Sequence, residues 1–196
     1  LEFRRVLFRS RRQLLDHAIR DPLTGAFNRR HMDACLADAV ERQGRTGAPA
    51  SVVLLDVDHF KRINDHHGHA AGDAVMAGLA ALVRGRLRRL DLLFRIGGEE
   101  FIVLLPDTHG HDARVVAEQI RARTGEARWF DAPVTVSAGV SELVPGETAG
   151  AWLRRADEWL YVAKREGRNR VMGDGNLQVQ PDLPYPDAGI DRSIAR

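Results

Sequence analysis

The amino-acid sequence predicts one domain of the α/β or α+β class, in which helices flank a central sheet. Three observations lead to this prediction. Segments with helical spacing of apolar residues alternate with short apolar runs that are typical of strands. Two neighbouring apolar runs are separated by a Gly-Gly pair, which indicates a hairpin. No sequence repeat suggests a solenoid.

The elements follow one another in a regular order. A helix is expected to end at a turn that contains Asp21-Pro22-Leu23-Thr24-Gly25. The predicted helices cover residues 11–20, 27–43, 71–87, 112–123 and 151–165. The predicted strands cover residues 51–57, 92–96, 101–105, 134–140 and 169–172. We therefore expect a catalytic or binding domain over residues 21–172, after an N-terminal flank (1–20) that ends a connector helix.

The two ends of the chain have different compositions from the centre. Arginines interrupt the apolar residues of the first ten positions, which argues against a signal peptide, and we treat this segment as a candidate foreign sequence. Gly, Pro and Asp dominate residues 173–196, which we expect to be disordered. No apolar run approaches the length of a membrane span, so we expect no membrane contact by this segment.

Charge and cysteine content exclude some classes of protein. The 29 basic and 27 acidic residues give a formal charge of +2, which argues against a surface that coats nucleic acid. The one cysteine, Cys35, permits no internal disulfide and no Cys/His metal cluster. We expect a cytoplasmic domain, although a longer natural protein is compatible with a membrane anchor elsewhere.

Two acidic residues close the buried strand over residues 51–57. Asp56 and Asp58 alternate along the chain, so both carboxylates can share one face. Carboxylate oxygens suit Mg²⁺. Two solvated acids at a strand end would give the same pattern, and for an isolated Asp-x-Asp that reading is the more common one.

The predicted hairpin carries a second acidic pair. Gly97-Gly98 allows a ligand to approach the backbone closely, and Glu99 and Glu100 then point to opposite faces. One of them can join Asp56 at a metal ion. An ordinary hairpin with acids after its turn is an equally good explanation of this motif alone.

The motifs become specific when they are taken together. In order they are Asp21-Pro22-Leu23-Thr24-Gly25, Asn28-Arg29-Arg30, Asp56-Val57-Asp58-His59-Phe60-Lys61, Asn64-Asp65, His67-Gly68-His69, Gly72-Asp73, Gly97-Gly98-Glu99-Glu100-Phe101, Val136-Ser137-Ala138-Gly139-Val140, Ala156-Asp157, Tyr161, Ala163-Lys164 and Gly167-Arg168-Asn169. From about residue 21 to residue 172, the chain resembles the GGDEF family of diguanylate cyclases. The resemblance implies a palm-like fold with a mostly antiparallel sheet, related to class III nucleotide cyclases.

The resemblance also implies an activity, which is the Mg²⁺-dependent condensation of two GTP molecules into cyclic di-GMP and two pyrophosphates. It implies two Mg²⁺ ions per site, with Mn²⁺ as a substitute. The implied metal ligands are Asp56, the Val57 carbonyl and Glu99, and Asp58 becomes a supporting group. The implied catalytic set is Glu99, Lys61 and Asp56. The implied substrate-binding set comprises Asn64 and Asp73 at guanine, His69 near the nucleoside, Glu100, and Lys164 and Arg168, with Lys61, at phosphates.

An Arg-x-x-Asp motif precedes the hairpin. Arg88 and Asp91 match the family's inhibitory site for cyclic di-GMP, and their spacing from Gly97 favours this interpretation over a charge pair at a helix end. A second arginine often completes this site from the helix after the hairpin. Gln119 stands near the corresponding place, with Arg121 and Arg123 close in sequence, so how the site is completed stays open.

Two alternatives to an active cyclase fit the sequence less well. A degenerate member would bind nucleotide and signal through protein contacts, but such members usually lose the acidic hairpin or the Asp-x-Asp motif, and both are present. A cyclase that uses ATP is disfavoured by Asp73, because adenine lacks the donors that a carboxylate accepts. The expected partners are GTP, cyclic di-GMP as product and inhibitor, a second copy in a transient homodimer, and an upstream sensor domain.

Overall fold

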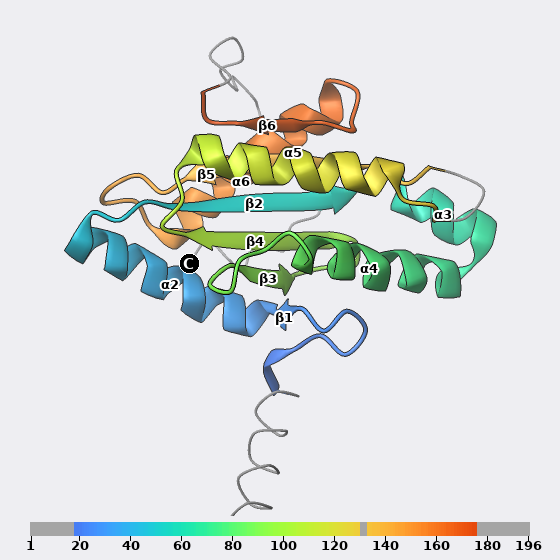
Figure 1. Cartoon of the computed structure of the whole chain (residues 1–196), viewed down its shortest axis with the longest axis horizontal. Coiled ribbons are helices and arrows are strands. Elements are labelled where there is room, and N and C mark those ends of the chain that lie inside the picture. The colour runs from blue at the N-terminus through green and yellow to red at the C-terminus, as the bar shows by residue number, and fades with distance from the viewer. Residues whose placement is uncertain (1–17, 130–132, 176–196) are drawn as a thin grey trace, which may run out of the picture.

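The structure, a computed structural model, describes residues 18–129 and 133–175. Six strands form one sheet in the order β1-β3-β4-β2-β5-β6. Their bounds are Phe27–Asn28 (β1), Ala50–Val57 (β2), Leu92–Arg95 (β3), Glu100–Pro106 (β4), Val136–Glu142 (β5) and Val171–Gly173 (β6). The helices are Arg29–Thr46 (α2), Phe60–His67 (α3), His69–Arg84 (α4), Gly110–Glu126 (α5) and Ala149–Arg165 (α6) (Figure 1).

The sheet is mostly antiparallel, as the family resemblance predicted. β2 lies at its centre, antiparallel to both β4 and β5, and β3 and β4 form the predicted hairpin. The two edge strands differ, because β1 pairs parallel with β3 and β6 pairs parallel with β5. The predicted fold class is confirmed.

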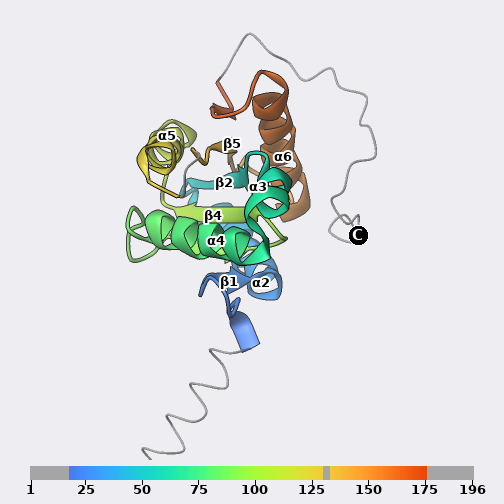
Figure 2. The same ribbon diagram turned by 90° about the vertical axis from the view of Figure 1, so that its right-hand side faces the viewer.

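Two helix pairs cover the two faces of the sheet (Figure 2). Every residue of β2 is buried, because alternate side chains enter different cores. Val53, Leu55 and Val57 pack with residues of α4 and α5. Val52 and Leu54 pack with residues of α2 and α6. By the same alternation, Asp56 faces the side of the sheet that α6 covers.

Helix α6 approaches the sheet unusually closely at one glycine. A β-carbon at Gly139 of β5 would overlap the backbone of Ala156 and Leu160 in α6. Trp152, a residue of α6, is fully buried, and its indole N–H donates to the Ser141 carbonyl of β5 at 2.9 Å. These contacts fix the helix that carries Asp157 and Lys164 over the end of β2.

The structure contains one helix that the sequence pattern did not predict. Helix α3 occupies a stretch that reads only as polar, and Phe60 and Ile63 are its partly buried apolar contacts with the core. It begins after His59, which adopts a left-handed conformation with φ 56°. Strand β1 was also not predicted, since two residues are too few for a period of two. The predicted helix over residues 11–20 and the predicted tail lie largely outside the described residues.

Candidate functional site

Asp56 is a buried acidic group at the end of the central strand, with 6% of its surface exposed. Its Oδ2 atom lies 2.8 Å from Lys164 Nζ on α6. Burial raises the pKa of Asp56 from 3.8 to about 6 despite this lysine, and the nearby carboxylates of Glu99 and Asp58 add to the rise. The site therefore holds more negative charge than Lys164 alone balances.

The hairpin between β3 and β4 brings the other carboxylates to the same place. Glu100 is paired with Asp56 in the sheet register, and the Val57 N–H donates to the Glu99 carbonyl at 3.4 Å. Burial raises the pKa of Glu100, and Asp56 raises it further. A β-carbon at Gly97 would lie 2.7 Å from Glu100 Oε2, so the glycine leaves room for this carboxylate.

The tip of the hairpin is held from outside the sheet. Arg95 of β3 donates to the Gly98 carbonyl at 2.8 Å and to Asp21 Oδ1 at 3.1 Å. Asp21 also accepts bonds from the Thr24 N–H and hydroxyl, which together with Arg95 keep its pKa below the usual value even though burial opposes this. The turn that the sequence identified at residues 21–25 thus supports the acidic hairpin.

The residues assigned to guanine lie on the two helices that follow β2. Asn64 of α3 packs against Gly72 of α4, where a β-carbon would overlap the Asn64 Oδ1 atom. Asp73 is the next residue of α4 and is exposed, as is His69 at the start of the same helix. Lys61 is exposed in the first turn of α3. These four side chains therefore lie beyond the end of the sheet where Asp56 sits.

Helix α6 contributes charge of both signs. Lys164 contacts Asp56, and one face of the helix also carries Asp157, seven residues earlier. Burial raises the pKa of Asp157, while Lys164 lowers it. Arg168 follows the helix in a left-handed conformation with φ 65° and is exposed. The sequence motifs included Asp157, but no role was predicted for it.

Asp58 differs sharply from Asp56 although it is only two residues away. Its Oδ1 accepts from the Ser137 hydroxyl at 2.7 Å, and its Oδ2 accepts from the Thr135 hydroxyl at 2.7 Å and from the Asn169 N–H at 3.0 Å. The protein itself therefore supplies donors to both oxygens. This agrees with the supporting role that the resemblance implied, and none of the three donors was predicted as a partner.

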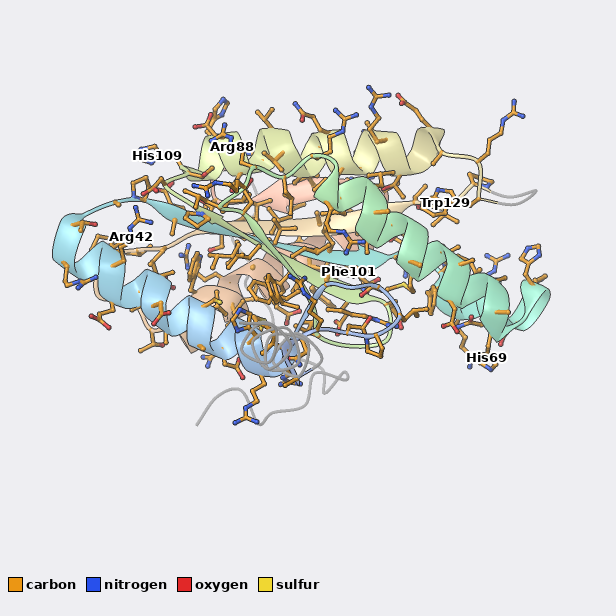
Figure 3. All side chains as sticks on the ribbon, turned by 60° about the horizontal axis from the view of Figure 1, so that its bottom comes forward. Arg42, His69, Arg88, Phe101, His109 and Trp129 are labelled. Carbon is orange, nitrogen blue, oxygen red and sulfur yellow. The ribbon has the colours of Figure 1, made fainter. Side chains whose placement is uncertain are left out.

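Arg88 and Asp91 lie at the other end of the sheet. They precede β3, whose first residue pairs with Leu104 near the end of β4. Figure 3 shows Arg88 far from His69 in the molecule. Asp91 Oδ2 accepts from the Arg88 N–H at 2.6 Å, and burial raises the pKa of Asp91. Arg88 is exposed, so its guanidinium is accessible to a ligand.

The two arginines that follow Gln119 have different surroundings. Helix α5 begins at Gly110, close to the end of β4, and a rise of about 1.5 Å per residue puts Arg121 about 16 Å further along. Arg121 bonds to Glu118 Oε2 at 2.6 Å and to Asn169 Oδ1 at 2.8 Å. Arg123, in contrast, lines a shallow pocket together with Gly85 and Arg86, which shortly precede the Arg88–Asp91 motif in the chain.

The donor set at the sheet end fits a hard divalent cation. Asp56 and Glu99 offer carboxylate oxygens, and Val57 offers a carbonyl oxygen. Among residues 18–129 and 133–175, no three His, Cys, Asp or Glu side chains form a complete metal-binding group by themselves. Mg²⁺ usually keeps several water or phosphate ligands beside one or two carboxylates, so the set here suits an ion that arrives with a nucleotide.

Comparison with known proteins identifies the family. A family model described as "Diguanylate cyclase, GGDEF domain" matches residues 18–170. The chain belongs to this family. The predicted family is thereby confirmed.

Several relatives share most of this domain. The response regulator PleD of Caulobacter vibrioides is 43% identical over 173 residues, which cover 83% of this chain and 38% of PleD. The chain thus spans well under half the length of that curated relative. The coiled coil and GGDEF domain of DgcB from Caulobacter crescentus, solved in complex with c-di-GMP, is 32% identical with a TM-score of 0.82, covering 88% of this chain and 93% of that one. The active GGEEF domain of a diguanylate cyclase from Vibrio cholerae is 41% identical with a TM-score of 0.72, covering 74% and 96%.

Within residues 18–129 and 133–175, no helix combines the length and the apolar character that crossing a bilayer requires.

Proposed function

We propose that this domain condenses two GTP molecules into cyclic di-GMP and releases two pyrophosphates in a reaction that depends on Mg²⁺, with Mn²⁺ as a substitute. The observation that carries the proposal is the meeting of Asp56, Glu99, Glu100 and Lys164 at the end of β2. Together with Asp157, these residues place four carboxylates and one lysine at the site, which suits the binding of a triphosphate together with cations.

Each residue has a defined task in this proposal. Asp56, the Val57 carbonyl and Glu99 would hold two Mg²⁺ ions, which would neutralise charge at the phosphates and favour ionisation of the attacking 3′-hydroxyl. Lys164 and Arg168, with Lys61, bind phosphate oxygens. Asn64 and Asp73 bind the guanine edge, and His69 lies near the nucleoside. Glu100 borders the same site beside Asp56.

The bond changes need two copies of the domain. The 3′-oxygen of one GTP attacks the α-phosphate of the other, the 3′-hydroxyl loses its proton, and pyrophosphate leaves. The same step in the opposite direction closes the ring. One copy offers one Asp56 and one guanine site, so two copies facing each other across a two-fold axis are the simplest catalyst.

Product control is a further part of the proposal. The exposed Arg88 guanidinium and the Asp91 carboxylate offer donors and acceptors for phosphate and guanine at the end of the sheet away from Asp56. Cyclic di-GMP bound there acts as a feedback inhibitor. The domain works in the cytoplasm, under an upstream sensor that brings two copies together.

The alternative is a domain that binds nucleotide without turnover. The two functions are separated by incubating the purified protein with GTP and Mg²⁺ and following cyclic di-GMP and pyrophosphate by chromatography. Formation of one cyclic di-GMP for every two pyrophosphates is expected, with none from ATP. Tight GTP binding without product, at protein concentrations high enough for pairing, supports the binding-only alternative instead.

A further inference from the structure

We propose that Asp58 is a positioning residue, which holds the turn at residues 167–169 so that Arg168 and Lys164 face the substrate phosphates. The inference rests on the proposed function, in which these two cations bind GTP. It assigns to Asp58 a task distinct from metal binding, together with three partners that transmit it: Thr135, Ser137 and Asn169.

Asp58 is buried, and its carboxylate is hydrogen-bonded to several parts of the chain. The residue is 5% exposed, and its two carboxylate oxygens accept three hydrogen bonds from the protein. Its own N–H donates to the Thr135 carbonyl at 2.9 Å. A carboxylate offers about four acceptor positions, so little capacity remains for another ligand. The segment after β2 is therefore tied to β5 and to the chain beyond α6.

The turn that Asp58 holds has a backbone that needs outside support. Gly167, Arg168 and Asn169 all have positive φ values of 116°, 65° and 45°. The left-handed region is unfavourable for most residues other than glycine, and such conformations persist where neighbouring groups enforce them. Arg168 and Asn169 adopt this conformation one after the other.

Three hydrogen bonds supply that support. The Arg168 N–H donates to the Ala163 carbonyl at 3.0 Å, which closes the end of α6. The Asn169 N–H donates to Asp58 Oδ2 at 3.0 Å, between residues that are 111 positions apart in sequence. The Asn169 side chain accepts from Arg121 of α5 at 2.8 Å. Of these anchors, Asp58 is the one that ties the turn to the end of the strand that carries Asp56.

The consequence is a fixed spacing between cations and carboxylates. Asp56 and Asp58 leave the same strand end, the first contacting Lys164 and the second holding the turn after Lys164. The Asp58 carboxylate bonds to residues 135, 137 and 169, none of which lies on α3 or α4, so a change at Asp58 is expected to move Arg168 more than the guanine residues. The expected defect is specific to phosphates.

The test compares two nucleotides that do not react. 3′-Deoxy-GTP lacks the attacking hydroxyl, and GMP lacks the leaving group, so affinities for both can be measured by calorimetry with Mg²⁺ present. The variant Asp58→Asn keeps the size of the side chain but turns an amide donor toward existing donors. It should weaken binding of 3′-deoxy-GTP by about tenfold and change binding of GMP by less than about twofold.

Partner variants and a double variant test how Asp58 acts. Thr135→Val and Ser137→Ala each remove one hydroxyl donor and should show smaller losses of the same kind, which also covers the case that Asp58→Asn does not fold. If Asp58 acts through Arg168, then adding Asp58→Asn to Arg168→Ala should cause little further loss, because the two effects are not independent.

Asp174 provides a matched control. It is also a partly buried carboxylate with several donors, namely the Ser141 hydroxyl, the Glu142 N–H, Arg155 and Trp159, but it lies at the opposite end of β5. Asp174→Asn should lower the melting temperature without changing the ratio of the two affinities. Equal weakening of both nucleotides by Asp58→Asn would overturn the inference and leave only a general structural role.

The outcomes also separate this inference from the proposed function. If Arg168→Ala weakens binding of 3′-deoxy-GTP while all three variants of the Asp58 cluster bind it normally, the inference is wrong and the function stands. If the wild-type protein binds 3′-deoxy-GTP no better than GMP and forms no cyclic di-GMP from GTP, the proposed function is wrong as well.

Discussion

The side chain of Asn64 lies directly against the α-carbon of Gly72, in the space that a β-carbon would occupy. Helix α4 can approach α3 this closely only because residue 72 has no side chain. Asp73 is the next residue of α4 after this contact. Two groups that can read the edge of guanine are positioned by one glycine.

Base choice is expected to depend on this packing. Asn64→Ala, Asp73→Ala and Gly72→Ala should each weaken GTP binding by about 1–3 kcal/mol, because guanine donors lose their acceptors. ATP lacks these donors, so its weak binding should change little. Competition between the two nucleotides for a fluorescent GTP analogue measures both affinities.

The control for Gly72→Ala is a glycine with open space around it. Gly44 lies within α2, and a β-carbon there meets nothing within 4 Å. Gly44→Ala should stabilise the helix by about 1 kcal/mol and leave base choice unchanged. Equal losses for GTP and ATP in the three variants would show that these residues do not read the base.

Metal dependence is expected to require both carboxylates at the end of β2. Asp56→Asn or Glu99→Gln should lower turnover by about 100-fold or more, since each change removes a charge that would hold Mg²⁺. Both residues sit at the edge of the core, so the fold should survive. Near-normal turnover in either variant would contradict the metal assignment, and Asp38→Asn, an exposed acid on α2, serves as the control.

The burial of Asp56 predicts how stability changes with pH when no metal is present. Its pKa in the folded domain is about 6, above the ordinary 3.8, so the folded state holds the proton more tightly than the unfolded chain. This contribution to stability is complete below the ordinary value and is lost as the pH rises through about 6. The difference corresponds to about 3 kcal/mol.

Urea unfolding in the presence of a chelator checks this expectation. Between about pH 4.5 and pH 7.5, the wild type should lose more stability than Asp56→Asn, which has no proton to lose at this position. Glu100 and Asp157, whose pKa values are also raised, are present in both proteins. Parallel pH profiles for the two proteins would show that Asp56 titrates normally.

Local sequence signals predicted some elements of the fold and missed others. Strand β2 and the hairpin were predicted, because apolar runs and a Gly-Gly pair are local signals. Helix α3 was not, because its polar sequence has only Phe60 and Ile63 to pack against the core. Its helical form depends on α4 and on the turn at His59, neither of which a local pattern records.

The site was predictable as a set of residues but not as a set of contacts. Sequence motifs identified Asp56 and Lys164, yet their contact at 2.8 Å arises from the close approach of α6 to Gly139. The partners of Asp58 lie far from it in sequence and are an ordinary serine, threonine and backbone N–H. Only the tertiary arrangement distinguishes them from other polar residues.

Product feedback should be relieved by changes at the other end of the sheet. Arg88→Ala or Asp91→Asn should keep progress curves linear after the wild type has slowed, because the ligand loses a guanidinium or a carboxylate. Asparagine at position 91 can still accept from the Arg88 N–H. Arg89→Ala, a neighbouring exposed arginine, should slow like the wild type. Undiminished binding of cyclic di-GMP in both variants would place inhibition elsewhere.

Assembly of two copies is expected to limit the rate of this chain. One domain offers a single Asp56, a single Glu99 and one guanine site, whereas the product is a ring made from two identical nucleotides. No long apolar heptad is visible between residues 21 and 172 that would form an obligate interface. Specific activity should therefore rise with protein concentration.

Fusing a parallel coiled coil before Arg11 should raise activity at low concentration, because it increases the local concentration of the second copy. A fusion to a helix of equal length that stays monomeric is the control and should behave like the unfused chain. Ultracentrifugation of each protein at the assay concentrations connects activity to pairing. A specific activity that stays constant on dilution, in a protein that sediments as a monomer throughout, would contradict the paired-site mechanism.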